Sequence, residues 1–265
     1  MNWAILVSAF TDPYERKARA FPGLLVILPL LISVCCVFGP ANPLSTAVLG
    51  LVVTAGGVFA LAALARVAGK RLEEKLVAKW GGMPSTLALR HRDSHFNQYT
   101  KQGYHQRLTQ LTGIKLPTVE EEASNPADAD ARYEAAISRL RNMTRGSQFP
   151  HLRRENIAYG FYRNALALKL QGLGAALAGF ALGALSANAF SPQRPYVLIE
   201  NLAHPGHPAA IALVSALLMM VIWLSFTKAN LKRIGFAYAD RLFECIDALP
   251  QEPSSNQSIQ SEGQL

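Results

Sequence analysis

Four long apolar segments constrain the fold of this chain more than any other feature of its sequence. They cover residues 21–38, 44–67, 166–190 and 208–226. The charged residues within them are Arg66 and Lys169, each close to one end of its segment. An α-helix rises about 1.5 Å per residue, so about 20 apolar residues cross the roughly 30 Å hydrocarbon core of a bilayer. Each segment is therefore predicted to be a transmembrane helix.

The composition agrees with this interpretation. Hydrophobic residues make up 50% of the 265, charged residues 17%, and the mean hydropathy is +0.15, which is more apolar than an average soluble domain. The sequence between the first two segments, Gly39–Pro43, has the residues of a tight turn and predicts a transmembrane hairpin over 21–67. A second hairpin is predicted over 166–226. Residues 1–20 are predicted to form an interfacial segment on the membrane surface.

The basic residues predict an orientation. Of the 26 lysines and arginines, 25 lie in the ranges 16–19, 66–169 and 228–241, and Arg194 alone lies between the third and fourth segments. By the positive-inside rule, the N-terminus, the central segment and the C-terminus are cytoplasmic. Basic residues beside anionic lipid headgroups also account for the net charge of +8, so the bilayer is an expected partner and nucleic acid is not.

The central segment, 68–165, is predicted to be a cytoplasmic helical domain. Thr118 and Glu121 match a capping box, and Asn125-Pro126 predicts the start of a second helix. The neighbouring run Glu120–Glu122 is interpreted as a solvated face. The predicted fold class is all-α, a four-helix transmembrane bundle with an inserted helical cytoplasmic domain.

Both ends of the central segment suggest helices that continue out of the membrane. The apolar pattern of the second segment runs on to Trp80, where Gly81-Gly82 should end it. Residues 227–249 repeat apolar positions every three or four residues and predict a cytoplasmic amphipathic helix that extends the fourth segment. The polar tail, 250–265, is predicted to be disordered.

The segment from Trp80 to Arg90 reads W-G-G-M-P-S-T-L-A-L-R, and with Glu155–Asn164 it resembles a group of uncharacterised bacterial multi-pass inner-membrane proteins. The resemblance implies a bacterial inner-membrane location but no activity, ligand or cofactor. The layout is also similar to that of membrane components of anti-phage defence systems. We expect the distinctive polar residues here to bind a partner: Trp80, Arg90, His91, Arg92, Asp93 and His105.

Arg90 and His95 offer an alternative, because their R-x4-H spacing resembles the catalytic motif of HEPN ribonucleases. An arginine grips phosphate in a fork and a histidine moves protons near neutral pH, so a membrane-tethered ribonuclease is chemically sensible. A structural or partner-binding role for both side chains is the competing interpretation. We predict no metal site and no cofactor, and whether the chain is an enzyme stays open.

The third segment carries Gly172, Gly179 and Gly183, small residues that let helices approach closely. They predict packing within one bundle or self-association into a homo-oligomer. No ionisable residue lies near the middle of any segment, which argues against a coupled transporter. The expected function is therefore a membrane scaffold, sensor or pore-forming effector whose cytoplasmic domain meets a protein or nucleotide partner.

Overall fold

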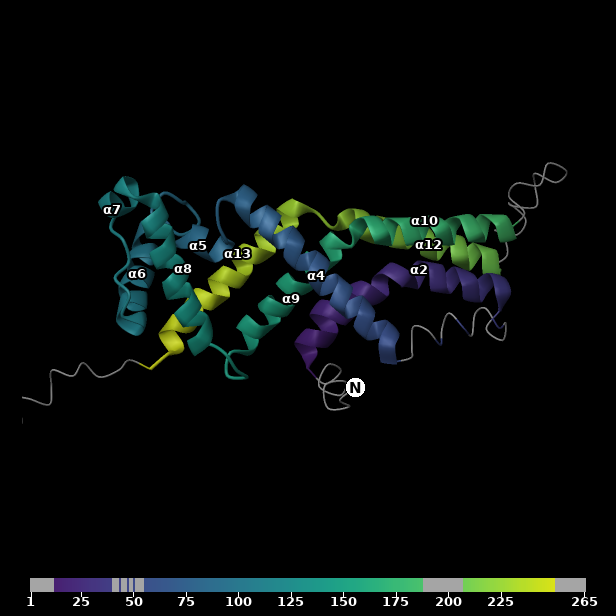
Figure 1. Cartoon of the computed structure of the whole chain (residues 1–265), viewed down its shortest axis with the longest axis horizontal. Helices are drawn as coiled ribbons and strands as arrows, with labels where there is room; N and C mark the ends of the chain where they lie inside the picture. Colours follow the sequence, from purple (N-terminus) through teal and green to yellow (C-terminus); the bar gives the residue numbers. More distant parts are fainter. Residues whose placement is uncertain are drawn as a thin grey trace, which may run out of the picture. The chain divides into compact units, whose positions relative to one another are not determined.

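The structure, a computed structural model, describes residues 12–39, 55–187 and 207–250, with positions 43, 47 and 50 between the first two ranges. Within these residues all regular secondary structure is helical. The helices, labelled as in Figure 1, are η1 (Glu15–Ala20), α2 (Phe21–Phe38), α4 (Ala55–Trp80), α5 (Pro84–Leu89), α6 (Gln98–Thr112), α7 (Val119–Ser124), α8 (Pro126–Met143), α9 (Pro150–Ala167), α10 (Lys169–Ser186), α12 (Pro208–Ser225), α13 (Lys228–Glu244) and η2 (Cys245–Ala248).

Some predicted segments fall outside this description. They are most of the interfacial segment, the end of the third apolar segment with the loop after it, and the tail after residue 250. The second apolar segment is described continuously from Ala55 onward.

The chain divides into two compact units. Unit 1 comprises Met1–Trp80 and Asn156–Ile234, and unit 2 comprises Gly81–Glu155 and Gly235–Leu265. The predicted inserted domain, 68–165, shares 81–155 with unit 2. The C-terminal half of α13 also belongs to unit 2, because its apolar residues complete the core there.

In unit 1, helices α2, α10 and α12 pack against one another (Figure 1). Two helices are long and apolar enough to cross a membrane, Glu15–Phe38 and Pro208–Ser225. A third candidate span is the pair α9 and α10, which meet at a bend of 62°. Two to three described helices therefore have the length and composition of membrane spans.

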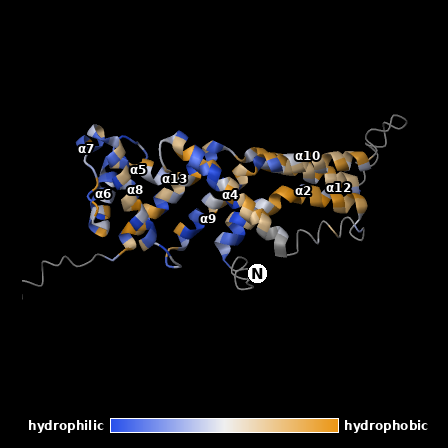
Figure 2. Cartoon of the chain, viewed as in Figure 1, coloured by the Kyte–Doolittle hydropathy of each residue, from blue (hydrophilic) through white to orange (hydrophobic). Residues whose placement is uncertain are grey.

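Helix α10 buries small residues and exposes large apolar ones, and α12 also exposes large apolar side chains although it buries Leu213 and Trp223. The residues that α10 buries are Gly172, Ala176, Gly179, Gly183 and Ala184. The large apolar side chains left exposed on α10 and α12 are Leu170, Leu177, Leu185, Ile211, Val214, Leu217, Leu218, Val221 and Leu224. Figure 2 shows the same helices as the most hydrophobic part of the ribbon. This is the reverse of a soluble bundle, which buries its large apolar residues.

Two chain breaks differ from the uninterrupted helices expected from the sequence. The predicted third span begins at residue 166, but the helix breaks at Leu168, where Lys169 Nζ donates to the carbonyls of Leu224 (3.2 Å) and Phe226 (2.9 Å). The fourth helix ends at Ser225, and Tyr162 bridges the gap before α13: its hydroxyl donates to the Ser225 carbonyl and accepts from the Thr227 amide. The side chains of Lys169 and Tyr162 thus hydrogen-bond backbone groups at the break between α12 and α13, whereas the Leu168 amide keeps its bond to the Asn164 carbonyl.

Helix α4 behaves as predicted at its C-terminal end. It runs without interruption from Ala55 to Trp80 and stops where Gly81 and Gly82 adopt φ values of 79° and 152°. A side chain is strained at these angles, so the two glycines provide the turn.

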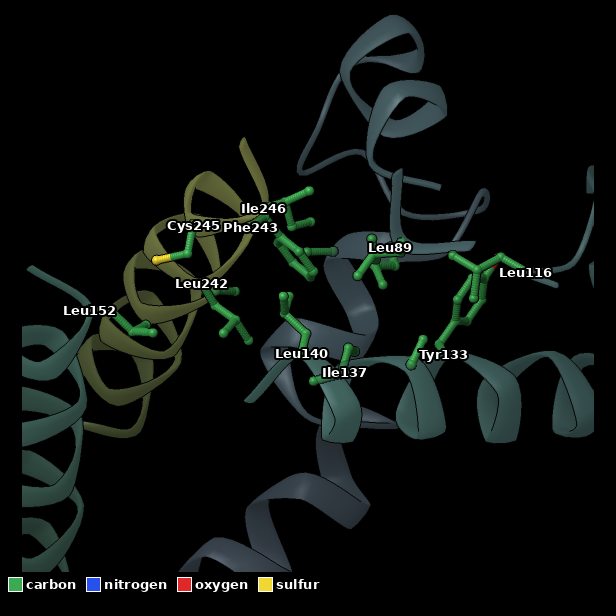
Figure 3. Packing of buried hydrophobic residues seen from close by; sticks show 14 of the residues in the cluster. Leu89, Leu116, Tyr133, Ile137, Leu140, Leu152, Leu242, Phe243, Cys245 and Ile246 are labelled. Carbon is green, nitrogen blue, oxygen red and sulfur yellow. The ribbon is translucent and has the colours of Figure 1, made fainter. Parts of the chain in front are cut away.

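The core of unit 2 joins its helices with the C-terminal half of α13 and with η2 (Figure 3). Its largest fully buried side chains are Leu89, Leu108, Tyr133, Ile137, Leu140, Leu242, Phe243 and Ile246. The capping box of α7 forms as predicted, with Thr118 and Glu121 each bonding the other's backbone amide. Asn125 caps α8, again as predicted.

Candidate functional site

Residues 90–97 form the Arg90 loop, which connects α5 to α6 and contains no helix. Arg90 ends α5, and its side chain turns inward. Its guanidinium binds the Asp130 carboxylate in a fork, with Nε 2.6 Å from Oδ1 and Nη2 2.7 Å from Oδ2. Nη2 also donates to the Gly81 carbonyl at 2.5 Å. The Arg90 side chain is only 9% exposed, so this pair joins α5 to α8 inside unit 2.

Glu122 is the second anchor of the loop. Its Oε2 accepts hydrogen bonds from the His91 amide (2.8 Å) and the Tyr133 hydroxyl (2.7 Å). Its Oε1 accepts from the Arg92 amide (3.2 Å) and from Arg92 Nη1 (2.8 Å). Burial alone would raise the pKa of the Glu122 carboxyl, but these hydrogen bonds and the Arg92 charge outweigh it and hold the pKa below its ordinary value.

The pKa of the Tyr133 phenol is shifted in the opposite direction, above its ordinary value. Burial raises its pKa, and the hydrogen bond to the Glu122 carboxylate raises it further. The phenol therefore stays protonated and keeps donating to the carboxylate.

Helix α6 holds the same loop from the other side. Lys101 Nζ donates to the carbonyls of Arg90 (2.6 Å) and Asp93 (2.5 Å). Burial lowers the Lys101 pKa, although Asp93 and Glu122 oppose that shift. His105 Nε2 lies 2.7 Å from the Leu89 carbonyl.

Burial lowers the pKa of His105 to about 4, against the raising effect of its hydrogen bond to the Leu89 backbone. The imidazole is therefore neutral at pH 7, and Nε2 must carry its proton to donate to that carbonyl. His91 lies beside it, with 4.6 Å between the ring centroids, and its own Nε2 is 3.0 Å from the Pro117 carbonyl.

His95 lies apart from these groups. Its ring stacks on Phe236 with 4.4 Å between centroids, and its Nε2 is 2.5 Å from Asp240 Oδ1 on α13. Arg90 is occupied by Asp130 and Gly81. In this conformation the two residues of the R-x4-H spacing are each bound to other groups of unit 2, and the loop between them is not helical.

A cavity of about 1340 Å³ lies beside the Arg90 loop. We call it the α6 groove. The Arg90 loop contributes His91, Arg92, Asp93 and Phe96 to its lining. Helix α6 contributes Gln98, Lys101, Gln102, His105, Gln106, Thr109 and Gln110. The segment around α7 contributes Leu116, Pro117, Thr118, Val119, Glu120, Glu122, Ala123 and Pro126. Every one of these residues belongs to unit 2.

The predicted partner-binding residues divide into three groups. His91, Arg92, Asp93 and His105 line the α6 groove, whereas Arg90 lies beneath the loop as a buried anchor. Trp80 is the last residue of α4 and belongs to unit 1. The structure thus brings four of the six together around one cavity.

The interpretation of Glu120–Glu122 as a solvated face is wrong at Glu122, which is 2% exposed. Sequence reasoning also missed Asp130 as a partner of the loop and Tyr133 as a partner of Glu122. One signal was present: Glu122 and Tyr133 both occupy inward positions of helices whose caps are recognisable. Glu122 contacts His91 and Arg92, and Tyr133 contacts His105, all about 30 positions earlier in the chain, so no local sequence pattern indicates these contacts.

The predicted packing glycines lie against neighbouring helices of unit 1. A Cβ added to Gly172 would come within 2.0 Å of the Trp223 indole, and one on Gly179 within 2.9 Å of the Pro29 carbonyl oxygen. A Cβ on Gly183 would meet Ala212 at 3.1 Å. All three glycines are therefore positions of close helix approach within the chain.

Among the described residues, no group of three or more His, Cys, Asp or Glu side chains is arranged to hold a metal ion. The charged groups around the Arg90 loop are paired with one another, which fixes the shape of the groove wall. Comparisons with protein-family models, curated proteins and solved structures give no match.

Proposed function

We propose that this chain is a multi-pass protein of the bacterial inner membrane, a scaffold or sensor whose helical unit 2 binds a partner in the cytoplasm. The observation that carries the membrane assignment is the reversed packing of α10 together with the large apolar surface that α12 leaves exposed. Helix α10 buries glycine and alanine, and α10 and α12 together expose leucine, valine and isoleucine. Such a surface is stable in lipid, where apolar side chains need no burial, and is an aggregation liability in water.

The four-helix bundle and its orientation are part of this proposal. The support for four spans is the four apolar segments, and the support for cytoplasmic ends and a cytoplasmic unit 2 is the placement of 25 of the 26 lysines and arginines. The glycine face of α10 packs inside the chain, so close helix contact supports a stable bundle more directly than a self-assembling pore.

The partner-binding role is supported by the α6 groove. A preformed cavity of this size, walled by a loop that the buried Glu122, the part-buried Asp130 and Lys101 hold in place, has the properties of a recognition site. Enzymatic chemistry is less well supported, since Arg90 and His95 are each bound to carboxylates elsewhere.

Membrane fractionation tests the assignment. The full-length chain should stay in the membrane pellet after washing with sodium carbonate at pH 11, and should leave it only with detergent. Release of the chain into the carbonate supernatant would show peripheral attachment and overturn the proposal.

A further inference from the structure

We infer that the α6 groove binds an extended, non-acidic polypeptide segment of a partner protein, rather than a nucleotide or another phosphate-bearing ligand. The inference deepens the proposed function, because it names the kind of partner that unit 2 recognises. It depends on the composition of the two walls, on the spacing of groups along α6, and on the charge of the lining.

One wall is a row of side-chain amides. Gln98, Gln102, Gln106 and Gln110 recur every four residues along α6, and all four line the groove. Each is exposed, and within the described residues no hydrogen bond occupies its amide. Each amide offers two donors and an acceptor. The row can therefore bond both N–H and C=O groups of a ligand.

The spacing of this row fits a polypeptide backbone. Positions four residues apart on a helix are separated by about 6 Å along its axis. In an extended chain, backbone groups that point to the same side recur every second residue, at about 6.6 Å. An extended segment lying along α6 can thus place one amide or carbonyl beside each successive glutamine.

The second wall, around α7, is partly apolar. It contributes Leu116, Pro117, Val119, Ala123 and Pro126 beside the polar Thr118, Glu120 and Glu122, and Phe96 also lines the groove. Val119 leaves 56% of its surface exposed, which is a large apolar contact available to a ligand. The side chains of an extended peptide alternate in direction and stand at right angles to its hydrogen-bonding edges, so with one edge along α6 every second side chain can contact this second wall.

The charge of the lining argues against a phosphate. Its cationic side chains are Arg92 and Lys101, and its carboxylates are Asp93, Glu120 and Glu122, which sum to a net charge of −1 when histidines are not counted. Arg92 already binds Glu122 and Asp130, and Lys101 Nζ already binds two carbonyls. Both cationic side chains of the lining therefore already have partners, and neither is available to form charge-assisted hydrogen bonds with a phosphate.

Selection from a displayed peptide library against the full-length protein in nanodiscs tests the inference. The library carries 12-residue peptides with Val, Ile, Leu or Phe at every second position and Ser, Thr, Asn or Lys between them. We expect enriched peptides to bind the double variant Gln102→Ala/Gln106→Ala about tenfold more weakly than the native chain, as measured by fluorescence anisotropy. Gln148→Ala, an exposed glutamine of unit 2 outside the groove, is the matched control and should leave affinity unchanged.

Backbone methylation gives a second measurement that does not alter the protein. Methylating alternate backbone nitrogens of the enriched peptide removes the donors from one of its two edges. Methylation of the edge that faces α6 should weaken binding about tenfold, and methylation of the other edge should not.

Three results would overturn the inference. They are a failure to enrich any peptide, equal affinity of enriched peptides for the native chain and the double variant, and ATP binding that depends on Gln102 and Gln106. Failure of the groove is distinguishable from failure of the proposed function, because a chain that resists carbonate extraction but enriches no peptide remains a membrane protein.

Discussion

Arg90 and Asp130 form a bidentate ion pair, in which each carboxylate oxygen lies within 2.7 Å of a guanidinium nitrogen. The pair joins the end of α5 to the first turns of α8 and is largely screened from solvent. It explains why an arginine that the sequence offers as a catalytic residue lies beneath the groove.

Removing Arg90 should destabilise the protein. Arg90→Ala leaves the part-buried Asp130 carboxylate with Arg92 as its remaining partner, and loss of charge-assisted hydrogen bonds of this kind costs about 2 kcal/mol. Arg90→Lys should recover only part of this, because an ammonium cannot make the bidentate contact. Thermal unfolding of the full chain in detergent measures both. Arg145→Ala, at an exposed arginine of unit 2, is the control, and an equal midpoint for both alanine variants would contradict the account.

Combining Arg90→Ala with His95→Ala tests the ribonuclease alternative. If the chain is a scaffold or sensor, neither the native protein nor the double variant should cleave RNA. We expect purified native protein in nanodiscs to leave single-stranded RNA intact. Cleavage by the native chain would contradict our assignment, and its loss in the double variant would assign the chemistry to these residues if circular dichroism shows that the variant is folded.

Glu122→Gln should weaken unit 2 by roughly 2 kcal/mol. The amide that replaces the carboxylate cannot accept four hydrogen bonds or balance Arg92, so buried donors lose their partner. Glu120→Gln, two positions earlier in the same helix and exposed, should unfold at the native midpoint. Similar midpoints for the two variants would show that Glu122 is not the anchor we describe.

The stability of unit 2 should depend on pH through His105. Above its ordinary pKa of 6.5 the imidazole is neutral in both the folded and the unfolded chain. As the pH falls from 6.5 toward 4, the unfolded chain takes up a proton that the folded chain does not, so the free energy of unfolding decreases. The decrease is at most about 1.4 kcal/mol per pH unit.

A variant that cannot titrate isolates this contribution. His105→Gln should flatten the pH dependence of thermal unfolding between pH 6.5 and 4.5, whereas His151→Gln, at an exposed histidine, should keep the native slope. The same slope in all three proteins would mean that His105 titrates normally when folded.

Gly172→Ala should destabilise unit 1, because the new Cβ would lie within 2.4 Å of three atoms of the Trp223 indole. Overpacking of this kind costs about 1–3 kcal/mol. Gly174→Ala, in the same helix but with open space at its Cβ, should be harmless. If the contact is the cause, Gly172→Ala should have a smaller effect in a Trp223→Leu background, and an unchanged effect there would assign the loss to something else.

Local sequence signals predicted much of what is local in the fold. The apolar segments predicted α2 and α12. The Thr118 capping box and the Asn125 cap predicted where α7 and α8 begin, and Gly81-Gly82 predicted where α4 ends. Each of these features depends on residues within a few positions of one another.

The remaining features depend on distant contacts. The break at Leu168 is accompanied by bonds from Lys169 to carbonyls more than 50 residues away, which no periodicity reveals. Glu122 looks like its two glutamate neighbours until Tyr133 and the Arg90 loop are placed around it. The pairing of Arg90 with Asp130 is also not visible in the sequence, because an aspartate near the start of a helix is expected there for its favourable charge alone.

The most direct test of the central claim is the side of the membrane on which unit 2 lies. In a background with Cys35, Cys36 and Cys245 replaced by alanine, single cysteines are introduced by Ser147→Cys, in unit 2, and by Ser191→Cys, between the third and fourth apolar segments. In intact spheroplasts, a membrane-impermeant maleimide should label the Ser191→Cys chain at once and the Ser147→Cys chain only after permeabilisation. Labelling of Ser147→Cys in intact spheroplasts would contradict the account.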